Sequence, residues 1–220
     1  MKNILCYGDS NTWGQIAGSM NMELRLAKRY EYGVRWTSIL QQSLGAAYHV
    51  IEGGLNGRNT SFDETNIIRP SRNGLATLPL IMEMNYPLDL VVLMLGTNDT
   101  LLEFNAPVER IVEGIKKLIQ CVKASHFGPN HFAPQVLLIA PAPITQNALT
   151  IFQGFLDQSS ITKTEQLGML YQKLAEEQQC YFLNAAPIVK VSPNDGIHLM
   201  RDSQKDLAKA VANKIEEMKL

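Results

Sequence analysis

Four polar residues of this chain have the types and the order that nucleophilic chemistry at a carbonyl carbon requires. Ser10 follows a short apolar run, Asn98 follows a longer one, and Asp195 precedes His198 by three positions. A hydroxyl nucleophile, an imidazole base, a carboxylate that orients the base and an amide that donates to an oxyanion are the components of acyl transfer through serine. These residues predict such a site if the fold brings them together.

Each of these residues also has an ordinary structural explanation. Ser10 could belong to a simple turn that ends a strand, and Asn98 could form an Asx turn. Asp195 could cap the chain that follows it, and His198 is one of four histidines. All of these explanations would have to hold together, at matching ends of the predicted strands. We therefore favour the chemical interpretation.

Short apolar runs alternate with amphipathic segments, and this order predicts βαβ units with a parallel sheet. The expected strands are residues 4–7, 48–51, 88–95, 135–140 and 181–184. The expected helices are residues 34–44, 78–85, 107–122, the second half of a segment that ends near 179, and 202–218. Because crossovers are right-handed, we expect one three-layer α/β/α domain, 1–220, with a five-stranded parallel flavodoxin-like sheet.

The carboxyl ends of parallel strands lie along one edge, where open α/β sheets bind ligands. Ser10 follows the first expected strand, a turn with Gly54 follows the second, and Asn98 follows the third. The loop after the fifth strand carries Asp195 and His198. The backbone N–H groups at Gly54 could approach a ligand closely, because glycine has no side chain. The topology thus predicts that all of these groups converge.

Charge and composition exclude several classes of partner. Lys plus Arg (20) nearly balance Asp plus Glu (21), which predicts no nucleic-acid binding and no polybasic membrane contact. No apolar run has the length of a membrane span, and the N-terminal apolar run is too short for a signal peptide. The three cysteines have no metal-ligand spacing and predict buried free thiols in a reducing compartment, the cytoplasm.

Residues 146–160 place apolar side chains outside the βαβ units, including Phe152, Phe155 and Leu156. Such side chains must be covered by their own domain, by substrate or by another subunit. We therefore consider this segment as a lid, as a partner surface, or as part of the packing of its own domain.

Four short blocks carry a resemblance to a known family. They are Gly8-Asp9-Ser10, Gly54 with residues 57–60, Gly96-Thr97-Asn98-Asp99 and Asp195-Gly196-Ile197-His198. In order and spacing they resemble the SGNH (GDSL-type) hydrolases over nearly the whole chain. Longer matches at residues 8–14, 34–36, 50–52 and 95–100 resemble the arylesterase/acyltransferase branch, which includes oligomeric esterases with perhydrolase activity. Asn11 stands where the family name expects Leu, and we expect it only to pack. Gly53 stands where that branch often has Glu.

The resemblance implies that Ser10 is the nucleophile, His198 the base and Asp195 the residue that orients the base. The oxyanion donors would be the backbone N–H groups of Ser10 and Gly54 and the side-chain amide of Asn98. The implied protein is a homo-oligomeric serine esterase or acyltransferase of the SGNH hydrolase fold. It acts on small, acetyl-like carboxylic esters and needs neither a metal nor an organic cofactor.

The alternatives within this family differ in substrate: a carbohydrate O-deacetylase, a thioesterase or a lysophospholipase. A flavodoxin-like protein that binds a nucleotide at the same strand edge would be a different class of protein. That alternative is weakened because the chain has no Gly-x-Gly-x-x-Gly turn and no phosphate loop.

Overall fold

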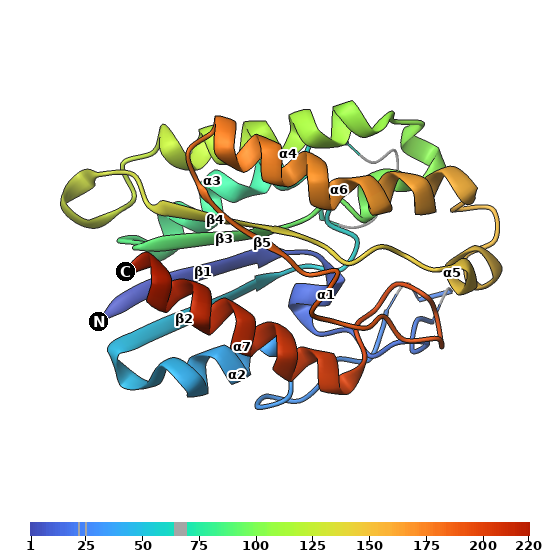
Figure 1. Cartoon of the computed structure of the whole chain (residues 1–220), viewed down its shortest axis with the longest axis horizontal. Helices are drawn as coiled ribbons and strands as arrows, with labels where there is room; N and C mark the ends of the chain where they lie inside the picture. Colours follow the sequence, from blue (N-terminus) through green and yellow to red (C-terminus); the bar gives the residue numbers. More distant parts are fainter. Residues whose placement is uncertain (22, 25, 64–69) are drawn as a thin grey trace.

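A five-stranded, all-parallel sheet with the strand order β2-β1-β3-β4-β5 forms the centre of the molecule (Figure 1). The computed structural model describes residues 1–21, 23–24, 26–63 and 70–220. The strands are β1 (Lys2–Gly8), β2 (Tyr48–Gly54), β3 (Leu90–Met94), β4 (Gln135–Ala140) and β5 (Tyr181–Asn184). All five expected strands are present, and their order is that of the flavodoxin-like sheets.

Helices cover both faces of the sheet, which confirms the three-layer α/β/α fold (Figure 1). One face carries α3 (Gly74–Asn85), α4 (Val108–Lys123) and α6 (Gln158–Glu177), and the other carries α2 (Trp36–Leu44) and α7 (Arg201–Met218). The short helices α1 (Ser10–Trp13) and α5 (Gln146–Ile151) lie beyond the carboxyl ends of the strands (Figure 1). Connections contain the 3-10 turns η1 (Gly45–Ala47), η2 (Asn98–Thr100), η3 (Leu102–Phe104) and η4 (Pro129–His131).

Strand β1 shows why the strand sequences are continuously apolar. Leu5 and Tyr7 pack with α3, α4 and α6, whereas Ile4 and Cys6 pack with α2 and α7. Neighbouring residues of a strand point to opposite faces of the sheet. A strand that is covered on both faces must therefore be apolar at every position.

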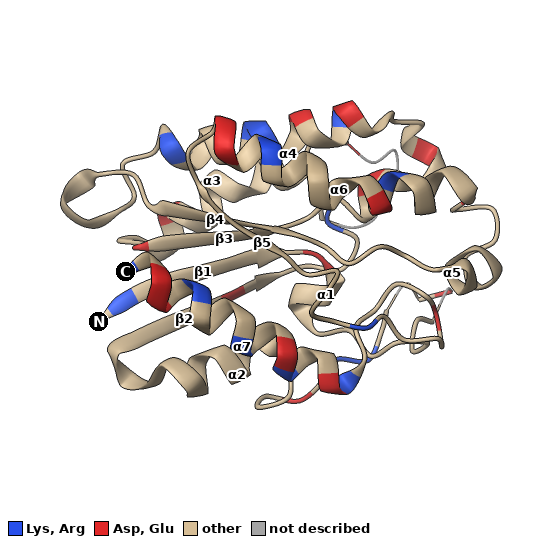
Figure 2. Cartoon of the chain, viewed as in Figure 1, with Lys and Arg blue, Asp and Glu red and all other residues tan. Residues whose placement is uncertain are grey.

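The helices that flank the sheet carry charged residues of both signs (Figure 2). In α4 the buried residues recur at spacings of three and four, as expected for a helix with one face on a sheet. They are Ile111, Gly114, Ile115, Leu118, Ile119 and Val122. Among the described helices, none combines the length and the apolar character that crossing a bilayer requires.

Several boundaries differ from the sequence-based expectation. Helix α3 begins at Gly74, four positions before the expected start, because the side chain of Asn73 caps it by accepting the N–H of Ala76 at 3.2 Å. Strand β3 is shorter than the expected strand 88–95, although Leu88 and Leu95 are fully buried. The prediction of buried thiols holds for Cys6, whereas Cys121 and Cys180 are half-buried.

Candidate active site

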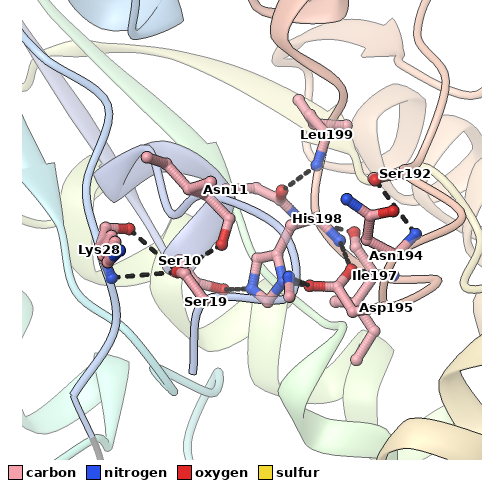
Figure 3. Close-up of polar contacts among 12 residues, drawn as sticks. Ser10, Asn11, Ser19, Lys28, Ser192, Asn194, Asp195, Ile197, His198 and Leu199 are labelled. Carbon is pink, nitrogen blue, oxygen red and sulfur yellow. Dashed lines mark hydrogen bonds and ion pairs between the residues drawn. The ribbon is translucent and has the colours of Figure 1, made fainter. Parts of the chain in front are cut away.

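Ser10, His198 and Asp195 form a continuous hydrogen-bonded series at the carboxyl edge of the sheet (Figure 3). The Nε2 atom of His198 lies 2.9 Å from Oγ of Ser10, and its Nδ1 atom lies 2.7 Å from Oδ2 of Asp195. Ser10 and His198 are 188 positions apart in the chain. The side chains are only 6%, 4% and 1% exposed in the order Ser10, His198, Asp195, so bulk water has little access to the series.

The carboxylate of Asp195 is held by backbone groups on both oxygens. Oδ1 accepts the N–H groups of Ile197 at 3.1 Å and His198 at 3.0 Å, and Oδ2 accepts that of Gly18 at 2.8 Å. Burial would raise the pKa of Asp195, but the hydrogen bond and the positive charge of His198, with backbone N–H groups, lower it to about 2. Asp195 is therefore ionised at neutral pH and can fix the orientation of the imidazole.

Helix α1 positions Ser10. Asp9 caps this helix, since its Oδ1 accepts the N–H of Asn11 at 2.9 Å, and Ser10 is the first helical residue. The N–H groups of the first helical turn have no partner within the helix and are available to a ligand. Gly8 allows this sharp turn, because a Cβ there would lie 2.1 Å from Oγ1 of Thr12.

A cavity of about 150 Å³ opens beside Ser10 and His198. A cavity of this size holds a molecule of about the size of benzene. Besides Ser10 and His198, the polar part of its lining is Gln15, Asn56, Gly57, Thr97 and Asn98. The apolar part of its lining is Met20, Leu101, Ile144, Phe152, Leu156 and Ile197.

Asn98 lies where the sequence placed it, in η2 directly after β3, and it lines the cavity with Ser10. Its Nδ2 donates one hydrogen bond to the carbonyl of Arg58 at 3.0 Å. The amide nitrogen carries two N–H groups. One of them therefore fixes the side chain, and the second is available to a ligand.

Gly54 does not belong to the described lining of the cavity, and the geometry around it does not favour its predicted role as an oxyanion donor. The next residue, Leu55, donates its N–H to the carbonyl of Gly8 in β1 at 3.1 Å. Successive N–H groups of a strand point to opposite sides, so the N–H of Gly54 points away from β1. A Cβ at Gly54 would lie 2.2 Å from the backbone nitrogen of Trp13. The glycine is therefore required so that α1 can pack against β2.

Gly57 lies three positions further along the same loop. It lines the cavity and has a φ of +78°, a backbone conformation that glycine adopts easily. Its N–H donates no hydrogen bond to any described residue. The sequence showed a glycine-rich loop here, but it did not show where each backbone N–H points. That direction depends on a turn in which the N–H of Arg58 donates to the carbonyl of Leu55 at 3.1 Å.

Asn11, which was expected only to pack, holds the loop that carries His198 (Figure 3). Its Oδ1 accepts the N–H of Leu199 at 3.0 Å, and its Nδ2 donates to the carbonyl of Ile197 at 3.3 Å. These two backbone groups flank His198. Asn11 therefore ties the turn that carries the nucleophile to the loop that carries the base, and the packing interpretation was wrong.

The segment 146–160 divides between the cavity and the surface. Phe152 and Leu156 line the cavity, and they pack with Ile144 in a small apolar cluster. Phe155, by contrast, is 49% exposed. Phe152 and Leu156 are thus covered by their own domain and lie where a substrate would contact them. Phe155 is covered by neither.

A buried serine, imidazole and carboxylate in series, beside a cavity at the edge of a parallel sheet, define a serine hydrolase site. The model of the GDSL-like Lipase/Acylhydrolase family matches residues 6–205, and the chain belongs to this family. It is a carboxylic ester hydrolase, and the resemblance to SGNH hydrolases is confirmed. Among the described residues, no cluster of three or more His, Cys, Asp or Glu side chains could hold a metal ion.

Solved structures of esterases are similar to this chain over its full length. The aryl esterase of M. smegmatis is 35% identical, with a TM-score of 0.90, and 99% of each chain is covered. A carbohydrate acetylesterase from Sinorhizobium meliloti is 35% identical, with a TM-score of 0.89, covering 99% of this chain and 100% of that one. A carbohydrate acetylesterase family member from the same organism is 32% identical, with a TM-score of 0.87 and 99% of each chain covered. No curated protein matches the chain.

Proposed function

We propose that the protein hydrolyses small, acetyl-like carboxylic esters through an acyl-enzyme on Ser10. The observation that carries this proposal is the hydrogen-bonded series of Ser10, His198 and Asp195 beside the cavity. His198 takes the hydroxyl proton as Oγ of Ser10 attacks the ester carbonyl, and Asp195 stabilises the imidazolium that forms. His198 then protonates the departing alcohol. Water, activated by the same imidazole, releases the acyl group as a carboxylic acid.

Three donors from separate elements would hold the tetrahedral oxyanion. They are the backbone N–H of Ser10 in α1, the backbone N–H of Gly57 after β2, and the second N–H of Asn98 in η2. Gly57 replaces Gly54 in this set because Gly57 lines the cavity. Donors that are fixed before the reaction stabilise the oxyanion without reorganisation, which makes them effective in a water-poor site.

The volume of the cavity, about 150 Å³, supports a short acyl group and disfavours a lysophospholipase with a long acyl chain. A carbohydrate O-deacetylase is the second candidate, because a relative named as a carbohydrate acetylesterase is 35% identical over the whole chain. The nucleotide-binding alternative is not retained, since the chain belongs to a family of acylhydrolases.

Hydrolysis of p-nitrophenyl acetate by the pure protein, with no cofactor added, tests the proposal. Ser10→Ala should lower kcat by several orders of magnitude without unfolding the protein. A serine-directed phosphonate should label Ser10 in the wild type. Ser159→Ala is the matched control, because Ser159 is an exposed serine that bonds only Asp157. Labelling at Ser159 or Ser160, or full activity of Ser10→Ala, would contradict the assignment.

We also propose that residues 1–220 form one domain and that copies of it associate as a homo-oligomer. The exposed apolar side chains of Ile151 and Phe155, 54% and 49% exposed, support association through the end of α5. Static light scattering tests it. The cytoplasmic location, and the absence of nucleic-acid and membrane partners, of a metal and of an organic cofactor, stay predictions from the sequence.

A further inference from the structure

Gln15 carries a buried side-chain amide for which the described part of the chain offers no hydrogen-bond partner. Its side chain is 1% exposed, and neither Oε1 nor Nε2 contacts a donor or an acceptor among the described residues. The same side chain lines the cavity beside Ser10. Buried amides in proteins are almost always hydrogen-bonded, so an unpartnered one beside a reactive serine requires an explanation.

The backbone places this amide next to the nucleophile. Gln15 follows the left-handed Gly14 that ends α1, and its N–H donates to the carbonyl of Ser10 at 3.0 Å. Its side chain therefore begins one turn from the attacking hydroxyl. Two further unpartnered buried atoms, Oδ1 of Asn56 and Oγ1 of Thr97, belong to side chains that line the same cavity. We call Gln15, Asn56 and Thr97 the polar wall.

The polar wall comes from three separate segments of the chain. The lining of the same cavity also contains apolar residues, among them Phe152 and Leu156. A wholly apolar ligand would leave the buried amide of Gln15 unpaired, which is unfavourable. A ligand that supplies both a donor and an acceptor would satisfy it, because an amide presents one oxygen and two N–H groups.

We propose that Gln15 determines specificity by binding a hydroxyl group on the non-reacting part of a small ester. A single hydroxyl both donates and accepts, so it can bond Oε1 and Nε2 of Gln15 at once. An ionic group is disfavoured, because no Lys, Arg, Asp or Glu belongs to the described lining of the cavity. The inference rests on the proposed esterase function and extends it to a substrate class, the hydroxylated short-chain esters.

Two pairs of esters of nearly equal shape test the proposal and locate the hydroxyl group. On the alcohol side, 2-hydroxyethyl acetate is compared with propyl acetate. On the acyl side, ethyl glycolate is compared with ethyl propionate. For the wild type we expect kcat/KM to favour the hydroxylated member of one pair by roughly tenfold or more, because a site built for a hydroxyl discriminates against its absence.

Gln15→Met removes the amide and keeps the length of the side chain. The kcat/KM ratio within the preferred pair should fall about tenfold in this variant, to the value set by the intrinsic reactivity of the two esters. The free variant should unfold at a temperature no lower than the wild type, because an unpaired buried amide does not stabilise the fold. Gln15→Leu provides a second variant. Leu101→Met, in the apolar part of the lining, is the control that changes cavity shape and should keep the wild-type ratio.

The possible outcomes are distinct. A wild type that hydrolyses both members of both pairs equally would overturn the role of Gln15 and leave the esterase function intact. A preference that survives in Gln15→Met and Gln15→Leu would also overturn it. A protein that hydrolyses none of the four esters would contradict the proposed function itself. A preference that is lost only in the Gln15 variants supports the inference.

Discussion

The side-chain oxygen of Asn11 accepts the backbone N–H of Leu199 at 3.0 Å, which fixes the residue after the base to the residue after the nucleophile. The same amide donates to the carbonyl of Ile197 at 3.3 Å. Both ends of a single buried amide are therefore used to hold the backbone on either side of His198. The 2.9 Å contact between His198 and Ser10 depends on this connection, because the two residues belong to separate segments of chain.

Replacing Asn11 with Leu should lower kcat by about tenfold or more and change KM little, because the imidazole loses its fixed distance to Ser10. Leaving the N–H of Leu199 unpaired should also lower the free energy of unfolding by about 1 to 3 kcal/mol. Asn11→Asp keeps the acceptor and loses the donor, so its kcat should fall less. Steady-state kinetics and thermal unfolding measure both effects, and a wild-type kcat in Asn11→Leu would restore the packing interpretation.

Asp195→Asn should lower kcat by about four orders of magnitude, as loss of the orienting anion does in serine hydrolases. In this variant an NH2 group replaces one carboxylate oxygen of Asp195. The backbone N–H of either Gly18 or His198 therefore loses its acceptor. The pKa of Asp195 is about 2 in the folded protein and is higher in the unfolded chain. Its contribution to stability is therefore complete above about pH 4 and is lost as the pH falls toward 2. Acid titration of unfolding should show this loss in the wild type and not in Asp195→Asn.

Asn98, which stays in the proposed oxyanion site, and Gly54, which does not, predict different failures. Asn98→Ala should lower kcat by roughly a hundredfold to a thousandfold with little change in KM, because it removes one donor. Gly54→Ala should destabilise the fold, because its Cβ would lie 2.2 Å from the backbone of Trp13. Comparing unfolding temperatures with kcat separates the two effects. A Gly54→Ala variant with wild-type stability and a strongly reduced kcat would return Gly54 to the catalytic site.

Asp99 gives the fold a pH dependence. It is fully buried, its Oδ1 accepts the N–H of Thr60 at 2.9 Å, and its Oδ2 has no partner among the described residues. Burial raises the pKa of Asp99 to about 7, despite the hydrogen bonds from Thr60. Between about pH 4 and pH 7 the folded state holds a proton that the unfolded chain has lost, so stability declines as the pH rises through this range.

Asp99→Asn keeps the acceptor for Thr60 and removes the titration. As the pH rises from about 4 to about 7, the unfolding temperature of the wild type should fall relative to that of Asp99→Asn. Thermal unfolding at several pH values in this range measures it. A constant difference across the range would show that Asp99 does not titrate there.

Phe152 and Phe155 should have separable effects. Phe152 lines the cavity, so Phe152→Ala should enlarge it and raise kcat/KM for longer acyl chains relative to acetyl. Phe155 is 49% exposed, so Phe155→Ser should weaken subunit association and leave the acyl-length preference unchanged. An acyl-length series and light scattering on the two single variants distinguish these effects. If Phe155→Ser alone changed the acyl preference, a partner subunit would have to shape the cavity.

The sheet could be predicted because its inner strands β1, β3 and β4 are covered on both faces, which makes most of their residues apolar. Helix α1 could not be predicted, because a helix of four residues is too short to show helical periodicity. Its start depends on the capping side chain of Asp9. Helix α3 was predicted too short for a similar reason. Its first turn is fixed by the Asn73 cap and carries little of the apolar pattern.

In the site, residue types that do chemistry were visible in the sequence, whereas the directions of backbone groups were not. Ser10, Asp195 and His198 stand out as a nucleophile, an orienting carboxylate and a base. The choice between Gly54 and Gly57 depends on where an N–H points after β2, which no residue type reveals. The role of Asn11 was hidden because its partners are backbone atoms 186 and 188 positions away.

The separation of 188 positions between Ser10 and His198 has a consequence for how this enzyme is made. A ribosome adds Ser10 to the chain 188 positions before it adds His198. A nascent chain, or a fragment that lacks the final loop, therefore carries the nucleophile without its base. Ester hydrolysis begins only when the turn that carries Ser10 and the loop that carries His198 have been brought together. Turnover thus reports complete folding, and its recovery after dilution from denaturant would time the last step of assembly.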